Sequence, residues 1–266
     1  LQTHAGGYGF VEPERPIEGG RDIYIAGPHL NEALHGDRVV VRIERVKEGG
    51  RAEGRVIRIL ERGQAWLVGR YDRGSDGMGY VVPFDRRVLM DILVPPGQEG
   101  GASPGEMVSL ELTKWPTPTR GAIGRVAKVL GHVDAPGVDT EVIIRKYGIP
   151  EAPSPEAVRE AVTLGTEVDE RDLQGRTDFR DQLTVTIDGE YARDFDDAIT
   201  LERLPNAHYW LGVHIADVSH YVTPGSALDR GAWKRGNSTY FPDRVAPMLP
   251  ESLSADLCSL RENEDR

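Results

Sequence analysis

Four aspartates lie within ten residues in the last third of the chain, and this spacing suits a divalent-metal site and a solvated acidic loop equally well. They are Asp188, Asp194, Asp196 and Asp197, called the aspartate set below. Carboxylates packed this closely raise one another's pKa and destabilise a fold unless a cation lies between them. Mg2+ prefers oxygen ligands and suits phosphate chemistry. The alternative is a solvated acidic loop, but the interleaved Phe195 is unusual for such a loop.

The neighbouring residues predict how the aspartate set is positioned. Residues 183–187 alternate apolar and polar side chains, which predicts a half-buried strand. Gly189 permits a turn after that strand. If the segment that follows is extended, Asp194 and Asp196 share one face and Asp197 points to the other. All four carboxylates then converge on one site only if the backbone kinks.

Length and composition describe an ordinary globular protein with more than one domain. The chain has 266 residues, of which 39% are hydrophobic and 28% charged. No apolar run approaches the roughly 20 residues that span a bilayer, and the amino end lacks a signal-peptide pattern, so we expect no membrane partner. The single cysteine, Cys258, excludes an internal disulfide framework and fits a cytoplasmic location. Its leucine neighbours predict a buried, structural thiol.

The net charge of −11 is unusual for a protein that binds nucleic acid. Most of it comes from residues 131–190, which hold 6 basic and 14 acidic residues. Residues 1–60 have 9 of each, and residues 61–130 have 9 basic and 8 acidic residues. Nearly neutral domains can still present a basic face, so the charge weakens the case for an RNA partner without excluding it.

The first 130 residues contain one pattern twice. Four blocks recur at offsets of 69 or 70 residues, beginning at Gly7 and Gly77, Asp22 and Asp91, Gly36 and Gly105, and Gly54 and Gly124. This period suits a small all-β domain. The second copy predicts five strands, which suggests an OB-type barrel, at 65–71, 79–84, 91–94, 107–112 and 122–130. The first copy contains only the last four, so we expect this chain to be part of a longer protein at its amino end.

Aromatic residues fall on two adjacent predicted strands of the first copy. Tyr8 and Phe10 share one strand face, and Tyr24 lies on the next strand. If exposed, they form a platform on which RNA bases stack. The alternative, equally open for any one of them, is a place in the barrel core. The second copy has Tyr80 but Leu93 at the position of Tyr24, so weaker stacking is expected there.

The remaining segments predict an acidic connector over 131–180 and mixed α and β structure after it. A helix is predicted from Ser154 through Leu164, with a proline in its first turn, and another over residues 226–235. His214 and His220 lie in an apolar pattern and are interpreted as structural. The predicted domains are therefore 1–60, 61–130, the connector, and 181–266.

Two resemblances to known families sharpen these expectations. The runs Gly7–Val11 and Asp22–Ile25 resemble the two RNA-contacting strands of cold-shock domains. The last third resembles the ribonuclease II/ribonuclease R family of exoribonucleases, and the order of two cold-shock domains before a catalytic domain is similar to its ribonuclease R branch. The second match rests on five runs of sequence: residues 188–198, 215–222, 224–229, 240–242 and 247–251.

The resemblance implies a mainly β protein in which two tandem OB-fold cold-shock barrels precede the truncated amino-terminal part of an α+β RNB catalytic domain. It implies a processive 3′→5′ exoribonuclease that acts on single-stranded RNA with Mg2+ and releases nucleoside 5′-monophosphates. By position, the aspartate set matches the family's metal-binding and catalytic acids. Asp188 and Asp197 are then expected as direct ligands, and Asp196 as the most damaging single loss. Tyr240 matches the tyrosine that packs on the 3′-terminal nucleotide, although a packed turn is an alternative role.

The family's catalytic domain continues well beyond residue 266, where it supplies further aromatics, a basic residue and an S1 domain. We therefore expect a monomeric, active parent nuclease and an inactive or nearly inactive 266-residue chain. Two other hypotheses stay open. One is an RNA-binding or chaperone protein with a non-catalytic nuclease-like domain, although an intact aspartate set argues against degeneration. The other is a two-barrel adaptor with solvated acids, which predicts no Mg2+ dependence.

Overall fold

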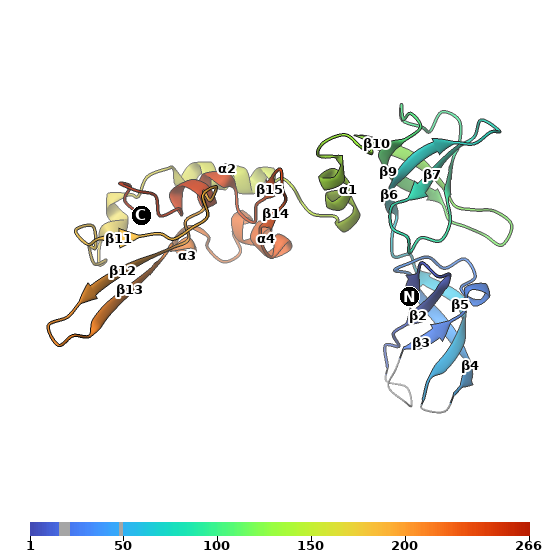
Figure 1. Cartoon of the computed structure of the whole chain (residues 1–266), viewed down its shortest axis with the longest axis horizontal. Coiled ribbons are helices and arrows are strands. Elements are labelled where there is room, and N and C mark those ends of the chain that lie inside the picture. The colour runs from blue at the N-terminus through green and yellow to red at the C-terminus, as the bar shows by residue number, and fades with distance from the viewer. Residues whose placement is uncertain (16–21, 48–49) are drawn as a thin grey trace. The chain divides into compact units, whose positions relative to one another are not determined.

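The computed structural model describes residues 1–15, 22–47 and 50–266 and divides the chain into two compact units, Leu1–Gly148 and Ile149–Arg266. The first unit is built mainly of strands, and the second combines helices with two small sheets (Figure 1). Within the described ranges, every helix is too short or too polar to cross a bilayer.

The first sheet has five strands in the order β1-β2-β3-β5-β4 and is a barrel that stays open between β1 and β4, called the first barrel below. They are β1 (Gln2–His4), β2 (Tyr8–Val11), β3 (Ile23–Ile25), β4 (Arg38–Val46) and β5 (Ala52–Glu61), with a 3-10 turn, η1, at Gly27–His29. Its core consists of Val11, Ile23, Ile25, Leu30, Ala33, Ala52 and Val56. The expectation of four strands was wrong, because β1 is present and pairs with β2. The alternation pattern missed it because β1 is three polar residues long.

The second sheet is a closed five-stranded barrel, which confirms the five predicted strands. They are β6 (Trp66–Arg73), β7 (Gly79–Pro83), β8 (Ile92–Val94), β9 (Glu106–Lys114) and β10 (Ile123–His132). Helix α1 (Val138–Tyr147) lies in the predicted acidic connector, which was expected to be partly helical but without a helix at this place. Val138 and Val142 of α1 pack against Val68 and Met107 of the barrel. This helix therefore forms a second, separate apolar cluster on the outer side of the barrel.

A buried carboxylate, Asp37, organises the junction between the two barrels. Its Oδ1 accepts the backbone N–H of Gly63 at 2.9 Å, and its Oδ2 accepts the backbone N–H of Leu34 and the guanidinium of Arg62, each at 2.8 Å. The Arg62 guanidinium also lies 4.7 Å from the ring centroid of Trp115 in the second barrel. Leu34 belongs to the second barrel's core. Residues of both barrels therefore form the junction, and the Asp37 carboxylate bonds three of them: Leu34, Arg62 and Gly63.

The second unit surrounds a helical core. Its elements are α2 (Pro155–Leu164), η2 (Glu170–Leu173), β11 (Thr184–Val185), β12 (Asp197–Arg203), β13 (Tyr209–Ile215), α3 (Val218–Tyr221), α4 (Ala227–Arg235), β14 (Thr239–Tyr240), β15 (Val245–Ala246) and η3, a π-helical turn at Leu253–Leu257. As predicted, α2 begins after Ser154, whose hydroxyl caps it, and α4 occupies the second predicted helix. The buried core of the second unit consists of Ala157, Ala161, Leu228, Leu249, Leu253, Leu257 and Cys258.

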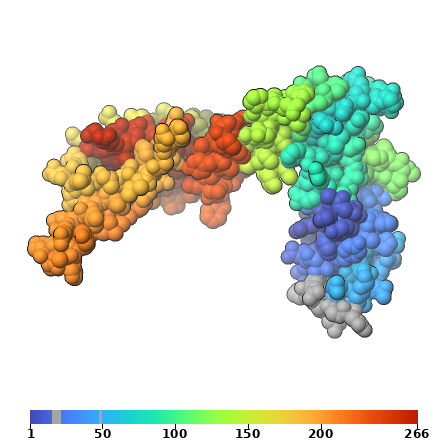
Figure 2. All heavy atoms as spheres, in the orientation of Figure 1, coloured from blue at the N-terminus to red at the C-terminus, as the bar shows by residue number. Residues whose placement is uncertain are grey.

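The β11-β12-β13 sheet carries an exposed apolar face. Its β12–β13 hairpin extends from the rest of the second unit as an arm (Figure 2). Cross-strand pairing places Ile199 beside Val213, and Leu201 beside Leu211. Most of this face is solvent-exposed, as Val185, Leu201, Leu211, Val213 and Ile215 show. The prediction of a half-buried strand over 183–187 was therefore wrong: its apolar residues alternate correctly, but no described element covers them.

Cys258 is buried, as predicted, and burial raises the pKa of its thiol to about 11. At pH 8 the thiol is therefore almost entirely protonated and unreactive. We expect Ellman's reagent to modify Cys258 at least about 10²-fold more slowly in the native chain than in urea-unfolded chain at the same pH, because a raised pKa and burial both withhold the thiolate. A native reaction as fast as the unfolded one would contradict this placement.

Candidate active site and nucleic-acid surface

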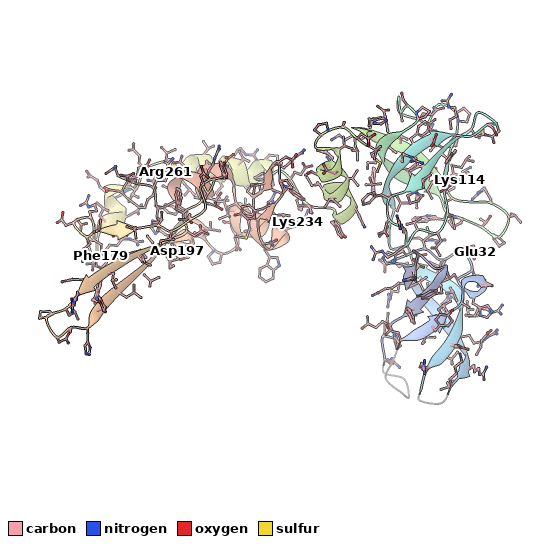
Figure 3. All side chains as sticks on the ribbon, in the orientation of Figure 1. Glu32, Lys114, Phe179, Asp197, Lys234 and Arg261 are labelled. Carbon is pink, nitrogen blue, oxygen red and sulfur yellow. The ribbon has the colours of Figure 1, made fainter. Side chains whose placement is uncertain are left out.

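The aspartate set lies on the segment that connects β11 to β12, called the acid loop (residues 188–197). Asp188 comes after β11, and Asp194 and Asp196 lie on the irregular part of the loop. Asp197 is the first residue of β12, at the root of the hairpin, and pairs with Ile215 of β13 (Figure 3). The backbone oxygen of Asp196 accepts the N–H of Ala216 at 2.9 Å. The loop therefore joins the sheet at its last two acids.

The four carboxylates interact electrostatically. The pKa of Asp196 is raised above its ordinary value, first by partial desolvation and then by the negative charges of the other three aspartates. Nevertheless, no group of three or more His, Cys, Asp or Glu side chains within the described ranges is arranged to hold a metal ion. The donor chemistry suits Mg2+, because the set offers only carboxylate oxygens whose repulsion a cation relieves. The structure thus brings the acids near one another without gathering them around one point.

Tyr240 touches the aspartate set directly. It lies on β14, and its hydroxyl donates to Asp194 Oδ2 at 2.7 Å. That hydrogen bond to a carboxylate is the main cause that raises the pKa of Tyr240. The side chain is 63% exposed, so the packed-turn alternative does not describe its ring. An exposed ring that is held at its hydroxyl can present a flat surface beside the acids.

Sequence reasoning missed Ser259, which holds the acid loop from 64 residues away. Its side chain bonds the loop backbone on both sides of Asp194. A single serine after a cysteine forms no sequence pattern that predicts this contact. The contact can be recognised only in the folded chain, because its partners are distant in the sequence.

The three aromatic residues of the first barrel meet on its surface. Phe10 of β2 and Tyr24 of β3 are cross-strand neighbours with ring centroids 5.8 Å apart. The Tyr8 ring lies 5.7 Å from each of them. His4 stacks on Tyr8 at 4.6 Å with an interplanar angle of 17°, an addition that the sequence did not suggest. None of the three predicted rings is buried, so the alternative of a core role fails for this cluster.

A groove beside the rings carries charges of both signs. Phe10, Tyr24 and Ala52 line it together with two bases, Lys47 and Arg51, and two acids, Asp22 and Glu53, of which Glu53 forms an ion pair with Lys47. Aromatic rings beside cations are the combination used to bind single-stranded nucleic acid. The groove and the rings therefore form one candidate nucleic-acid surface.

The second barrel preserves the register of this surface but not its chemistry. Tyr80 pairs with Leu93 as Phe10 pairs with Tyr24, so the repeat is confirmed at the level of strand register. Tyr80 is partly exposed and lacks an aromatic counterpart of Tyr24. A single ring offers less stacking area than a cluster.

The two histidines are held by other residues. His214 Nε2 lies 2.8 Å from the Thr200 hydroxyl, and His220 Nε2 lies 3.1 Å from an oxygen of Asp172. These contacts favour the structural interpretation of both residues.

Comparison with known proteins places each part of the chain. Family models match residues 1–59 as a Ribonuclease B OB domain, 80–152 as a Cold shock domain and 176–266 as an RNB domain. Ribonuclease R from Thermotoga maritima is 49% identical over 88% of this chain and 33% of its own length, and that from Vibrio parahaemolyticus is 46% identical over 99% and 31%. The chain thus spans about a third of these relatives.

A solved structure agrees with these matches over the whole chain. Mycoplasma genitalium RNase R in complex with ribose methylated single-stranded RNA superposes with a TM-score of 0.88 at 26% identity, covering 99% of this chain and 42% of that one. The likeness therefore includes both barrels and the part that carries the acid loop.

Proposed function

This chain belongs to the ribonuclease R family, and from that membership we propose that the full-length protein containing it is a 3′→5′ exoribonuclease. It hydrolyses single-stranded RNA processively, with Mg2+, to nucleoside 5′-monophosphates in the cytoplasm, and it works as a monomer. The observation that carries the proposal is an intact set of four coupled aspartates with Tyr240 bonded to one of them. The named ribonuclease R relatives and the RNA-bound structure support it.

The residues of the acid loop have distinct roles in this proposal. Asp188, Asp194, Asp196 and Asp197 would hold Mg2+. When bound, the ion would activate water and stabilise the leaving oxygen of the phosphodiester. Tyr240 packs its ring on the 3′-terminal nucleotide, while its hydroxyl keeps the Asp194 carboxylate oriented.

The barrels supply affinity and the acid loop supplies hydrolysis. Tyr8, Phe10 and Tyr24 stack on bases of the single strand, and the cations of the adjoining groove contact its phosphates. Tyr80 adds a weaker stacking site on the second barrel. We also propose that residues 1–266 alone bind RNA and hydrolyse it little or not at all.

The decisive experiment uses the full-length protein with single-stranded RNA labelled at its 3′ or its 5′ end. With Mg2+, the 3′ label is expected to appear at once as mononucleotide while the 5′ label stays on the remaining strand; chelator stops both. Binding without cleavage under every condition would instead favour an RNA-binding protein with a non-catalytic nuclease-like domain. Release of the 5′ label first would contradict the proposed direction.

Matched substitutions test the aromatic surface. Phe10 and Tyr80 occupy equivalent positions in the two barrels, so Phe10→Leu removes a ring from the cluster and Tyr80→Leu removes a solitary one. We expect Phe10→Leu to weaken RNA binding by about 1–3 kcal/mol, roughly 5- to 150-fold, and Tyr80→Leu to weaken it less. Fluorescence anisotropy in chelator at fixed salt measures both. Equal losses, or none for Phe10→Leu, would contradict the assignment.

A further inference from the structure

Ser259 brackets Asp194 with a single oxygen atom. Its Oγ accepts the backbone N–H of Phe195 at 3.0 Å and donates to the backbone carbonyl of Arg193 at 2.9 Å. These two groups flank Asp194 in the chain. The N–H of Leu260 also donates to the Phe195 carbonyl at 2.9 Å. The backbone on both sides of Asp194 is therefore fixed by the segment 259–260.

The serine itself is firmly anchored. It is fully buried, with 0% exposure, and its N–H donates to the Asp256 carbonyl at 2.9 Å. The preceding Cys258 N–H donates to the Leu253 carbonyl at 2.8 Å. Leu253 and Leu257 are each 1% exposed in the core of the second unit. A rigid core thus carries the hydroxyl that holds the acid loop.

The contact requires a hydroxyl. A hydroxyl group donates and accepts at the same time, whereas an alkyl side chain does neither and a thiol does both weakly. Between Asp188 and Asp196 the loop belongs to no strand, so its backbone depends on such outside partners. Loss of the hydroxyl leaves a backbone donor and an acceptor without their partner, which favours rotation of both toward water. That rotation displaces Asp194.

We propose that Ser259 is a positioning residue for the nuclease reaction: it sets the backbone of the acid loop so that Asp194 and its neighbours meet the metal and the scissile phosphate. The inference rests on the proposed function, because the acids are assigned to hydrolysis there. Ser259 acts through the loop and touches neither RNA nor metal. Two contacts then define Asp194, with Ser259 fixing its backbone and Tyr240 its carboxylate.

The test compares Ser259→Ala, Ser259→Cys and Ser259→Thr in the full-length protein. We expect kcat at saturating RNA to fall about 10²-fold in Ser259→Ala, as a misplacement near 1 Å does, and nearly as far in Ser259→Cys. Ser259→Thr keeps the hydroxyl and is expected to recover most of that loss. RNA affinity measured in chelator should change less than twofold for all three. Mn2+ binding, followed by electron paramagnetic resonance without RNA, should weaken in the same order as kcat.

Hydrogen–deuterium exchange separates positioning from general stability. Peptides covering residues 190–197 should exchange faster in Ser259→Ala, while peptides of α2 and α4 stay unchanged. Ser254→Ala in η3 is the matched control, since it removes a hydroxyl five residues earlier from the turn that leads to Ser259, and it should leave exchange and kcat at wild-type values. Wild-type kcat in Ser259→Ala, or equal losses in Ser254→Ala, overturn the proposal. A wild-type protein without nuclease activity refutes the proposed function, and unchanged exchange in the loop refutes the anchoring itself.

Discussion

Asp196→Asn in the full-length protein is expected to lower the rate of RNA hydrolysis by about 10²–10³-fold, the loss that follows removal of one preorganised electrostatic group. Asparagine has nearly the same shape but no negative charge, so the loop keeps its backbone while the metal loses a ligand or the attacking water loses its orientation. Asp196 is the acid on which the other three aspartates act, and it lies where the loop bonds to Ala216. Release of labelled mononucleotide at saturating Mg2+ measures the effect.

Two further measurements on Asp196→Asn, its RNA affinity and its thermal stability, separate a catalytic loss from a binding or folding loss. RNA binding in chelator should be unchanged or slightly tighter, because the variant removes a negative charge near the phosphates. Without Mg2+ its thermal stability should equal or exceed that of the wild type, since one of four repelling charges is gone. Glu190→Gln is the matched control: it removes an exposed charge from the same loop and should retain activity. Full activity of Asp196→Asn, or equal loss in Glu190→Gln, would remove the assigned role.

Asp37→Ala is expected to destabilise the first unit by about 3–5 kcal/mol, the cost of breaking a buried ion pair from one side. The side chain of Asp37 is fully buried, and its loss strips partners from Arg62, Gly63 and Leu34 at once. Gly63 approaches the backbone of Gly36 so closely that a Cβ there would lie 2.2 Å from a backbone carbon, so the junction has little room to rearrange.

The comparison for Asp37 is an exposed ion pair of similar length in the same barrel. Arg38 and Glu14 lie 2.7 Å apart with well-exposed side chains, so Glu14→Gln should leave the unfolding midpoint of the first unit close to that of the wild type. Because the two units need not unfold together, hydrogen exchange of β4–β6 peptides in increasing urea reports on the first unit. Equal midpoints for the two variants would show that the buried carboxylate does not organise the junction.

Local patterns in the sequence predicted the parts of the fold that depend on local physics. The five strands of the second barrel follow from alternation and turn residues, and the α2 start follows from Ser154 before a proline. Strand β1 escaped because three polar residues give no alternation. Helix α1 escaped because its burial depends on Val68 and Met107, which are distant in the chain.

The residues of the candidate site also fall into those that the sequence predicts and those that depend on long-range contacts. The aspartate set and the aromatic rings are recognisable from residue types and spacing, since like charges and exposed rings need an explanation wherever they lie. Burial and long-range contacts are not recognisable in this manner. Residues 183–187 alternate as a buried strand does, yet the covering layer is what decides burial. Ser259 and Asp37 matter through partners that only folding brings near.

The two copies of the barrel share their strand register but differ in the side chains on their surfaces. One copy keeps a ring at both positions of the Phe10 and Tyr24 pair, while the other has Tyr80 beside Leu93. In the second copy, protein covers part of the surface. Helix α1 packs against Val68 and Met107, and Leu34 packs into the core of the barrel. In a single barrel, an exposed aromatic face and a face covered by other elements compete for the same surface. Duplication places each of them on a different barrel. The first barrel therefore leaves its aromatic face uncovered, while the second barrel supplies the face on which α1 packs.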